Sequence, residues 1–247
     1  QGSHTHPPPQ KNIMHDLDKQ INQRLEDLAK KENLRHLSLP YSSLGKWIVV
    51  NEEKRLNLSG NDYLGLTERD DLREQFAALH PGYSTPSGST SSRLLLGNYE
   101  EAALFEEEIA KALEHPSALL FNSGYHLNTG ILPALAHLEG VKVYADRMVH
   151  ASIIDGIRLS RLPFTRFRHN DLEHLMELLK EDEGKYRISI VAVESLYSMD
   201  GDEADLKALV ALKKKYPSLV IYCDEAHAIG TRGANGYGLA EEQEVLA

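Results

Sequence analysis

Short apolar segments alternate with stretches of helical periodicity from Ser117 onward. This alternation is the strongest constraint on the fold, because repeated strand–helix units place helices over both faces of a mostly parallel sheet. Helices are expected near 125–138, 151–161, 171–181 and 204–215, and strands at ALLF (118–121), VKVYAD (141–146), FTRF (164–167), ISIVAVES (188–195) and LVIYCDE (219–225). The sequence therefore predicts an α/β fold with a mostly parallel sheet and helices on both faces.

The rest of the chain divides into two shorter parts. Residues 1–11 are polar and proline-rich, and their QGS start resembles the remnant of a cleaved tag, so we expect no fold there. An amphipathic opening helix and short strands at 47–50 and 55–66, the latter running into a turn, are expected next. We therefore expect an N-terminal helix with short strands in residues 12–60 and the α/β domain in residues 61–247.

The charge balance limits the classes of partner. Lys and Arg together number 27 against 37 for Asp and Glu, a formal net charge of -10, which argues against a nucleic-acid or anionic-membrane binder. No apolar run approaches the ~18 residues of a membrane-spanning helix. The one cysteine, Cys223, excludes an intrachain disulfide, and no export signal is visible, so we expect a cytoplasmic protein.

Two polar residues stand out at the last apolar segment: Asp224 follows its apolar run, and His227 comes three positions later. In open parallel sheets the ligand crevice lies beyond the carboxyl ends of the strands. A carboxylate there is desolvated unless a cation or several hydrogen-bond donors meet it. Asp224 either caps the next turn or pairs with a neighbour such as Arg232, or it meets a protonated nitrogen of a cofactor that His227 also contacts.

Three further strand ends carry polar residues. After ALLF, the residues NSGYHLN lead into a helix at Gly124, whose free backbone N–H groups suit a phosphate, although such a start is also an ordinary cap. His150 follows the segment 141–146, where a lone histidine is more often structural, and Ser198 follows 188–195. Together these ends would line one crevice with a phosphate seat, a flat histidine, a hydroxyl and a buried acid.

Six segments taken together resemble the α-oxoamine synthases, which are pyridoxal-phosphate enzymes of the aspartate-aminotransferase fold (type I). They stand in family order and with near-family spacing: SGNDYLGL (59–66), FNSGYHLN (121–128), DRMVHASIIDGIRLS (146–160), FRHNDLEHL (167–175), ESLYSMDGD (194–202) and CDEAHAIGTRGANGYG (223–238). The resemblance implies that residues 61–247 form an incomplete pyridoxal-phosphate-binding large domain, with the C-terminal small domain absent.

By this resemblance, three residues would act on the ring of pyridoxal phosphate. Asp224 matches the acid that pairs with the pyridine nitrogen, His150 matches the histidine stacked on the ring face, and His227 matches the histidine near the phenolic oxygen. A close carboxylate stabilises the protonated ring, which then withdraws electrons from the substrate's α-carbon.

The other matched positions would bind phosphate or substrate, and no metal is implied. Gly124 and Tyr125 match the positions that seat the phosphate, and Ser198 matches a polar contact beside the ring. Asn61 matches a residue close to the substrate carboxylate. Arg35 stands where members of the biotin pathway have a substrate-binding arginine, although a solvated arginine at a helix end explains it equally well.

The lysine that carries the cofactor in the family has no counterpart here. It would lie about 30 residues beyond the Asp-x-x-His segment, whereas the last lysine in this sequence is Lys215, before Asp224. We therefore interpret the chain as a fragment that lacks synthase activity and binds pyridoxal phosphate weakly or not at all. Apolar sheet surface should be left uncovered, and a homodimer is expected, with the glycine- and serine-rich loop at 84–97 near its interface.

The implied reaction condenses an amino acid with an acyl-CoA thioester and releases carbon dioxide. Arg35 and the spacing of WIVV favour 8-amino-7-oxononanoate synthase, whereas HASIIDG is also typical of glycine C-acetyltransferase; serine palmitoyltransferase and 5-aminolevulinate synthase remain open. A non-catalytic binding module that kept the fold is the alternative from another class. The HASIIDG and SMDGD segments disfavour an aminotransferase.

Overall fold

The structure is a computed structural model that describes residues 16–37, 42–79 and 89–246. The tag remnant expected at 1–11 and the first part of the loop expected at 84–97 lie outside these residues. Within the described ranges, no helix combines the length and the apolar composition needed to cross a bilayer. By its contacts the chain divides into two compact units, which are described one at a time.

The described residues of the first unit, which spans residues 1–59, form one helix and a small sheet. Helix α1 spans Asp16–Lys30, and the strands β1 (Ser42–Leu44), β2 (Trp47–Val50) and β3 (Glu53–Leu56) form an antiparallel sheet in that order. The stretch 55–66 is a strand only as far as Leu56. Beyond it the Asn57 side chain accepts a hydrogen bond from the Ser59 N–H, a local bond that favours a turn over a strand.

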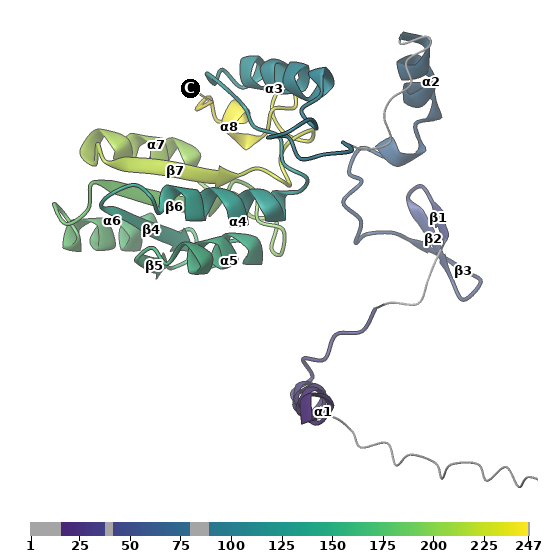
Figure 1. Ribbon diagram of the computed structural model, residues 1–247, viewed down its shortest axis with the longest axis horizontal. Coiled ribbons are helices and arrows are strands. Elements are labelled where there is room, and N and C mark those ends of the chain that lie inside the picture. Colours follow the sequence, from purple (N-terminus) through teal and green to yellow (C-terminus); the bar gives the residue numbers. More distant parts are fainter. Residues whose placement is uncertain (1–15, 38–41, 80–88, 247) are drawn as a thin grey trace, which may run out of the picture. The chain divides into compact units, whose positions relative to one another are not determined.

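The second unit, residues 60–247, is built on a four-stranded parallel sheet (Figure 1). Its strands are β4 (Val141–Asp146), β5 (Phe164–Phe167), β6 (Ile188–Glu194) and β7 (Leu219–Asp224), in the spatial order β5-β4-β6-β7. Every neighbouring pair is parallel, and Glu194 at the end of β6 lies opposite Asp224 at the end of β7. The predicted parallel sheet is confirmed, and its carboxyl ends share one edge.

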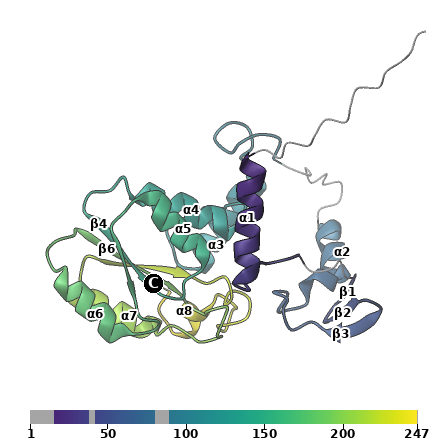
Figure 2. The ribbon, with the colours of Figure 1, turned by 90° about the horizontal axis from the view of Figure 1, so that it is seen from below.

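Helices cover both faces of this sheet, as the sequence predicts (Figure 2). Helices α4 (Gly124–Leu135) and α5 (Ala151–Ser160) pack on one face, and α6 (Leu172–Glu181) and α7 (Leu206–Lys215) pack on the other. Along β4, Val143 lies in the core beneath α4 and α5, and Tyr144 lies in the core beneath α6 and α7, because successive side chains of a strand point to opposite faces. The remaining helices of the described residues are η1 (Leu66–Glu68), α2 (Asp70–Leu79), α3 (Glu100–Ala112) and α8 (Leu239–Glu242).

The expectation of a strand at ALLF (118–121) is wrong, because this segment pairs with no strand. Its backbone groups form hydrogen bonds with side chains instead. The Leu120 N–H donates to Glu106 at 2.6 Å, and Arg93 donates to the Leu120 carbonyl oxygen at 3.3 Å. Arg93 and Glu106 also form an ion pair, and the guanidinium group lowers the pKa of Glu106 to about 2. The segment therefore leads into α4 as an extended connection.

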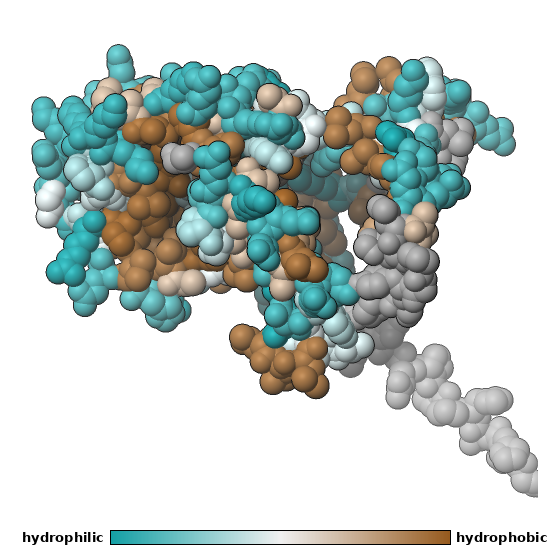
Figure 3. All heavy atoms as spheres, turned by 90° about the horizontal axis from the view of Figure 1, so that it is seen from above, coloured by the Kyte–Doolittle hydropathy of each residue, from teal (hydrophilic) through white to brown (hydrophobic). Residues whose placement is uncertain are grey.

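Strand β7 is one of the two outer strands of the sheet and is less buried than β6, although both are nearly continuous apolar runs. Val220 on β7 is 48% exposed. A cavity of about 510 Å³ runs between α7, β7 and α8 and is lined mainly by apolar side chains, among them Val210, Ile221 and Tyr237. Figure 3 shows that apolar side chains gather on one face of the second unit. Apolar surface beside β7 is thus open to solvent.

A partly buried ionic cluster connects the loops at the carboxyl edge. Asp146, fully buried at the end of β4, lies 2.8 Å from His169 Nδ1, and Asp202 lies 2.6 Å from His169 Nε2. The Tyr197 ring meets the imidazole edge-on, with 4.5 Å between the ring centroids. Because carboxylates only accept, both ring nitrogens must carry protons for both bonds to form. His169 therefore connects β4 to the loop that carries Ser198 and Asp202.

We expect His169 to make stability depend on pH. Burial lowers the pKa of His169, but hydrogen bonds to Asp146 and Asp202 outweigh burial, so the pKa lies above its ordinary value of about 6.5. A raised pKa gives a stabilisation that is complete below about pH 6.5 and is lost as pH rises through the folded-state value. Urea unfolding should show His169→Gln to be less stable than wild type by about 1–3 kcal/mol at pH 6, with the difference shrinking at higher pH. A difference that grows with pH would contradict this assignment.

Helices α4 and α5 approach each other closely at Gly156 of α5. A Cβ atom added there would clash with the backbone carbonyl oxygen of Asn128 and lie 2.9 Å from Leu132 Cδ1. At Gly130, in the middle of α4, an added Cβ atom would make only an ordinary contact of 3.5 Å with the Phe121 ring. The first glycine is thus required by packing, whereas the second is not.

These two helical glycines form a matched pair for mutation. Gly156→Ala should lower the free energy of unfolding by about 1–3 kcal/mol, because the backbones cannot approach as closely. Gly130→Ala should raise it by about 0.5–1 kcal/mol, because alanine restricts the unfolded chain and favours a helix. Chemical denaturation of both variants measures the difference, and a neutral Gly156→Ala substitution would disprove the close packing.

Candidate functional site

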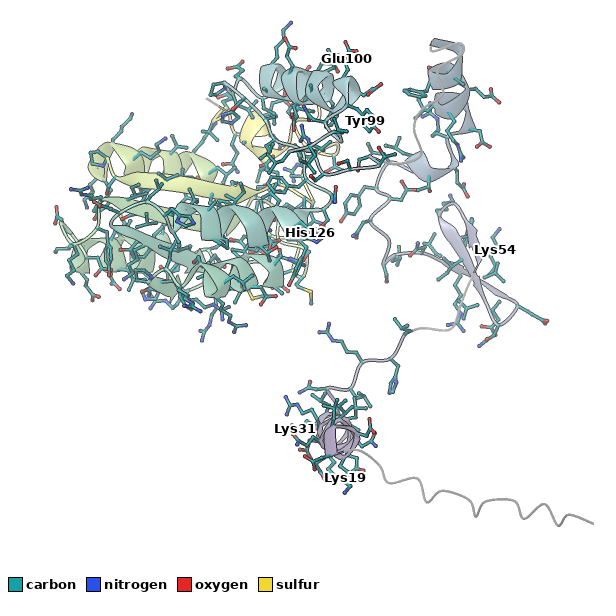
Figure 4. The ribbon with its side chains drawn as sticks, in the orientation of Figure 1. Lys19, Lys31, Lys54, Tyr99, Glu100 and His126 are labelled. Carbon is teal, nitrogen blue, oxygen red and sulfur yellow. The ribbon has the colours of Figure 1, made fainter. Side chains whose placement is uncertain are left out.

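The carboxyl edge of the sheet brings together most of the residues that the strand pattern singles out. Strands β4, β6 and β7 end there in the acids Asp146, Glu194 and Asp224. Helices α4 and α5 begin at the same edge, where Figure 4 shows His126 projecting from the first turn of α4. Because parallel strands aim their ends at one edge, residues far apart in sequence meet here.

Asp224 is half-buried and uses its two carboxylate oxygens differently. Oδ1 accepts a hydrogen bond from the Ala226 N–H at 3.0 Å, which caps the turn after β7. Oδ2 accepts one from the Asn128 side chain at 3.3 Å. Arg232, the alternative partner, pairs instead with Glu203 and Glu242. Asp224 therefore caps a turn with one oxygen, and its other oxygen can accept a further hydrogen bond at the edge of the sheet.

A line of hydrogen bonds connects Asp224 to His150. The Asn128 amide that donates to Asp224 also donates to Ser152 Oγ at 2.9 Å, and Ser152 Oγ lies 2.7 Å from His150 Nδ1. Asn128 and Ser152 are both almost completely buried. His150 is the N-cap of α5, since its Nδ1 also accepts the Ser152 N–H, and the residue is exposed. The histidine and the acid thus belong to one network.

His227 is held by a residue that the sequence does not single out. Its Nδ1 lies 2.6 Å from the hydroxyl of Tyr63, and the rings are edge-on with centroids 6.1 Å apart. Tyr63 comes from the SGNDYLGL segment, 164 positions away along the chain. Asn61 in the same segment is exposed. The segment reaches the carboxyl edge through its tyrosine.

Glu194 is a second buried acid that sequence reasoning misses. Its neighbour across the sheet is Asp224, and only 4% of the residue is exposed. Burial is the largest influence on the Glu194 carboxyl group and raises its pKa, although the nearby backbone N–H groups of His150 and Ser198 oppose this shift. Ser198 itself is exposed.

The start of α4 leaves room for a ligand. A Cβ atom added at Gly124 would find no atom within 4 Å, and Ser123 caps the helix by accepting the His126 N–H at 3.2 Å. The Tyr125 hydroxyl donates to Asp155 on α5 at 3.0 Å, and this carboxylate raises the pKa of Tyr125. The helix N-terminus is thus accessible beside Gly124.

Two further expected residues, Arg35 and Asn61, are exposed. Arg35 lies in the first unit, five positions beyond the end of α1, and its side chain is exposed. Asn61 lies in the second unit, but its side chain forms none of the hydrogen bonds found among the described residues of the edge. Among the residues that the structure describes, no group of three His, Cys, Asp or Glu side chains could hold a metal ion.

Comparison with known proteins identifies relatives of this chain. Residues 53–247 match the family described as aminotransferase class I and II. A Haemophilus influenzae protein named "Putative 8-amino-7-oxononanoate synthase" is 49% identical over 226 residues, which is 91% of this chain and 59% of that protein. A Neisseria gonorrhoeae protein of the same name is 48% identical over 93% of this chain and 60% of its own length.

Solved structures agree with this match. Serine palmitoyltransferase from Sphingomonas wittichii superposes with a TM-score of 0.76 at 31% identity, covering 96% of this chain and 58% of that one. 8-Amino-7-oxononanoate synthase from Francisella tularensis has a TM-score of 0.57 at 29% identity, over 76% of this chain and 50% of its own. The chain thus spans roughly three fifths of its curated relatives. It belongs to the class I and II aminotransferase family, in the α-oxoamine synthase branch with its type I fold.

Proposed function

We propose that this chain supplies the cofactor-binding part of a pyridoxal-phosphate-dependent acyltransferase that condenses an amino acid with an acyl-CoA thioester. The observation that carries the proposal is the hydrogen-bonded line from His150 through Ser152 and Asn128 to Asp224. It holds an imidazole and a carboxylate at the edge where type I folds bind their cofactor. The substrates and the activity of the complete enzyme are part of this proposal.

The residues at the edge fit the chemistry of pyridoxal phosphate. Asp224 offers a carboxylate with an oxygen that accepts only one weak hydrogen bond of 3.3 Å, which suits a protonated ring nitrogen. The open space in front of Gly124 and the N-terminus of α4 suit a phosphate. When bound, the cofactor acts as an electron sink for a carbanion at the substrate's α-carbon.

The chain's own residues then have separate tasks. The charge of Asp224 would hold the proton on the ring nitrogen, and the ring of His150 would pack on the cofactor face. His227, fixed by the Tyr63 hydroxyl at 2.6 Å, would meet the phenolic oxygen. Tyr125 and Ser198 would contact the phosphate and the ring side, and Asn61 and Arg35 the substrate. No lysine follows Lys215, whose position at the end of α7 lies at the opposite edge of the sheet from Asp224.

The relatives favour one member of the branch. The curated proteins that share 48–49% identity carry the name of 8-amino-7-oxononanoate synthase, whereas the serine palmitoyltransferase structure shares 31%. We therefore propose 8-amino-7-oxononanoate synthesis from alanine and a pimeloyl thioester, a step of biotin synthesis, in a cytoplasmic homodimer. Serine palmitoyltransferase is the second candidate, since its structure gives the TM-score of 0.76.

Ligand binding to the chain tests the proposed site directly. The probe is pyridoxamine 5′-phosphate, which has an amine in place of the aldehyde and therefore forms no adduct with surface lysines. In a titration of ¹⁵N-histidine-labelled chain followed by NMR, the ring signals of His150 and His227 should shift, with weak affinity. The signal of His137, which lies beyond the end of α4, should stay in place.

A matched pair of acid variants isolates the contribution of Asp224. Asp224→Asn should weaken pyridoxamine-phosphate binding by about tenfold, because it removes the charge that pairs with the ring nitrogen. Glu225→Gln changes the net charge equally, but the Glu225 carboxylate accepts the Ala240 N–H instead, so affinity should be unchanged. Equal affinity of both variants, or no shift of either histidine, would refute the site.

The substrate choice needs a chain of the relatives' full length. Such a protein, assayed with alanine, glycine and serine against several acyl-CoA thioesters, should turn over alanine with the pimeloyl thioester most efficiently. Preference for serine with a long acyl chain would instead identify a serine palmitoyltransferase, and preference for glycine with acetyl-CoA a glycine C-acetyltransferase.

A further inference from the structure

Asn128 uses every polar group of its side chain within the site. Its Oδ1 accepts a hydrogen bond from the Tyr222 hydroxyl, and its Nδ2 donates to Ser152 Oγ at 2.9 Å and to Asp224 Oδ2 at 3.3 Å. Asn128 lies on α4, Ser152 on α5, and Tyr222 and Asp224 on β7. One buried amide therefore connects three elements that meet only through the fold, and nothing in the sequence pattern marks it.

The orientation of this amide follows from its neighbours. A carboxylate can only accept hydrogen bonds, so the NH₂ group of Asn128 must face Asp224. The Tyr222 hydroxyl faces the other end of the amide and must donate. Burial, together with the charge of Asp224, raises the pKa of Tyr222 to about 12, so the phenol keeps its proton. Turning the amide over would set its oxygen against a carboxylate and its NH₂ group against a donor.

The backbone of Ser152 fixes the proton on His150. The Ser152 N–H donates to His150 Nδ1 at 3.2 Å. Nδ1 is thus an acceptor, and the neutral ring carries its proton on Nε2. The Ser152 hydroxyl, 2.7 Å from Nδ1, therefore donates to this nitrogen, while its oxygen accepts the hydrogen bond from Asn128 at 2.9 Å. The hydrogen bonds run in one direction, from Tyr222 through Asn128 and Ser152 to His150.

We propose that Asn128 is the positioning residue of the site: it orients the Asp224 carboxylate and the His150 ring together, and Tyr222 locks its amide in the required direction. This inference rests on the proposed cofactor site for its effect on ligand binding. Neither Asn128 nor Tyr222 needs to touch the ligand. A structural role alone would predict lower stability with no change in ligand affinity or in the His150 Nδ1 signal.

The test compares three variants of the 247-residue chain. Tyr222→Phe removes only the donor to Asn128, and Asn128→Leu removes all its hydrogen bonds at similar volume. Tyr144→Phe is the control, because its buried hydroxyl also donates to a side chain, but to Asp182, away from the network. All three should lose some thermal stability, which a melting curve records.

Two readouts separate positioning from stability. In ¹⁵N NMR without ligand, the His150 Nδ1 signal should move in Asn128→Leu, because the Ser152 hydroxyl that donates to this nitrogen loses its hydrogen bond from Asn128, and it should keep its wild-type position in Tyr144→Phe. The Nε2–H tautomer itself should persist in every variant, because the Ser152 N–H still donates to Nδ1. Pyridoxamine-phosphate affinity should fall about tenfold in Asn128→Leu and about threefold in Tyr222→Phe, and stay at the wild-type value in Tyr144→Phe.

The outcomes distinguish this inference from the proposed function. If wild type binds the probe and both network variants keep the wild-type affinity and His150 Nδ1 signal, the positioning role is overturned and the cofactor site stands. If wild type binds no probe, the proposed function fails, and the Nδ1 signal alone decides: a shift in Asn128→Leu supports the network, and an unchanged signal overturns it. If Asn128→Leu does not fold, Tyr222→Phe against Tyr144→Phe gives the same decision from affinity and the Nδ1 signal.

Discussion

The partial burial of the Asp224 carboxylate determines which hydrogen-bond donors the rest of the site must supply. A half-buried carboxylate beside a second, fully buried acid, Glu194, is unfavourable unless donors meet it. The fold supplies two donors, the Ala226 N–H and the Asn128 amide. With these two hydrogen bonds the carboxylate can still accept others at the edge of the sheet. This is the property expected of an acid that pairs with a ligand cation.

The architecture produces this arrangement through packing rather than through local sequence. Parallel strands bring Glu194 and Asp224 into register, and the close approach of α5 to α4 at Gly156 sets Ser152 against Asn128. The His169 cluster holds the loop after β6, which carries Ser198, to the end of β4. The rigid scaffold therefore fixes the loops from which the ligand contacts come.

The alternation of apolar runs with helical periodicity predicts β4 to β7 and the helices between them, because the central strands β4 and β6 are buried on both faces and each helix packs one apolar face on the sheet. It places Asp224 and His150 at strand ends for the same reason. It fails at ALLF, whose backbone bonds to Arg93 and Glu106, 27 and 14 positions away from Leu120. Asn128 and Tyr222 are missed because a helix asparagine and a tyrosine in an apolar run look ordinary until the fold joins them. Periodicity carries no information on such distant pairs.

A crystal structure of the chain with pyridoxamine 5′-phosphate would show whether the ligand binds at the carboxyl edge. We expect the ring nitrogen hydrogen-bonded to Asp224, the ring face against His150, the phosphate beside Gly124, and the Asn128 amide still joining Asp224 to Ser152. A ligand bound elsewhere, or an Asn128 side chain turned away from Asp224 with the ligand in place, would disprove this site.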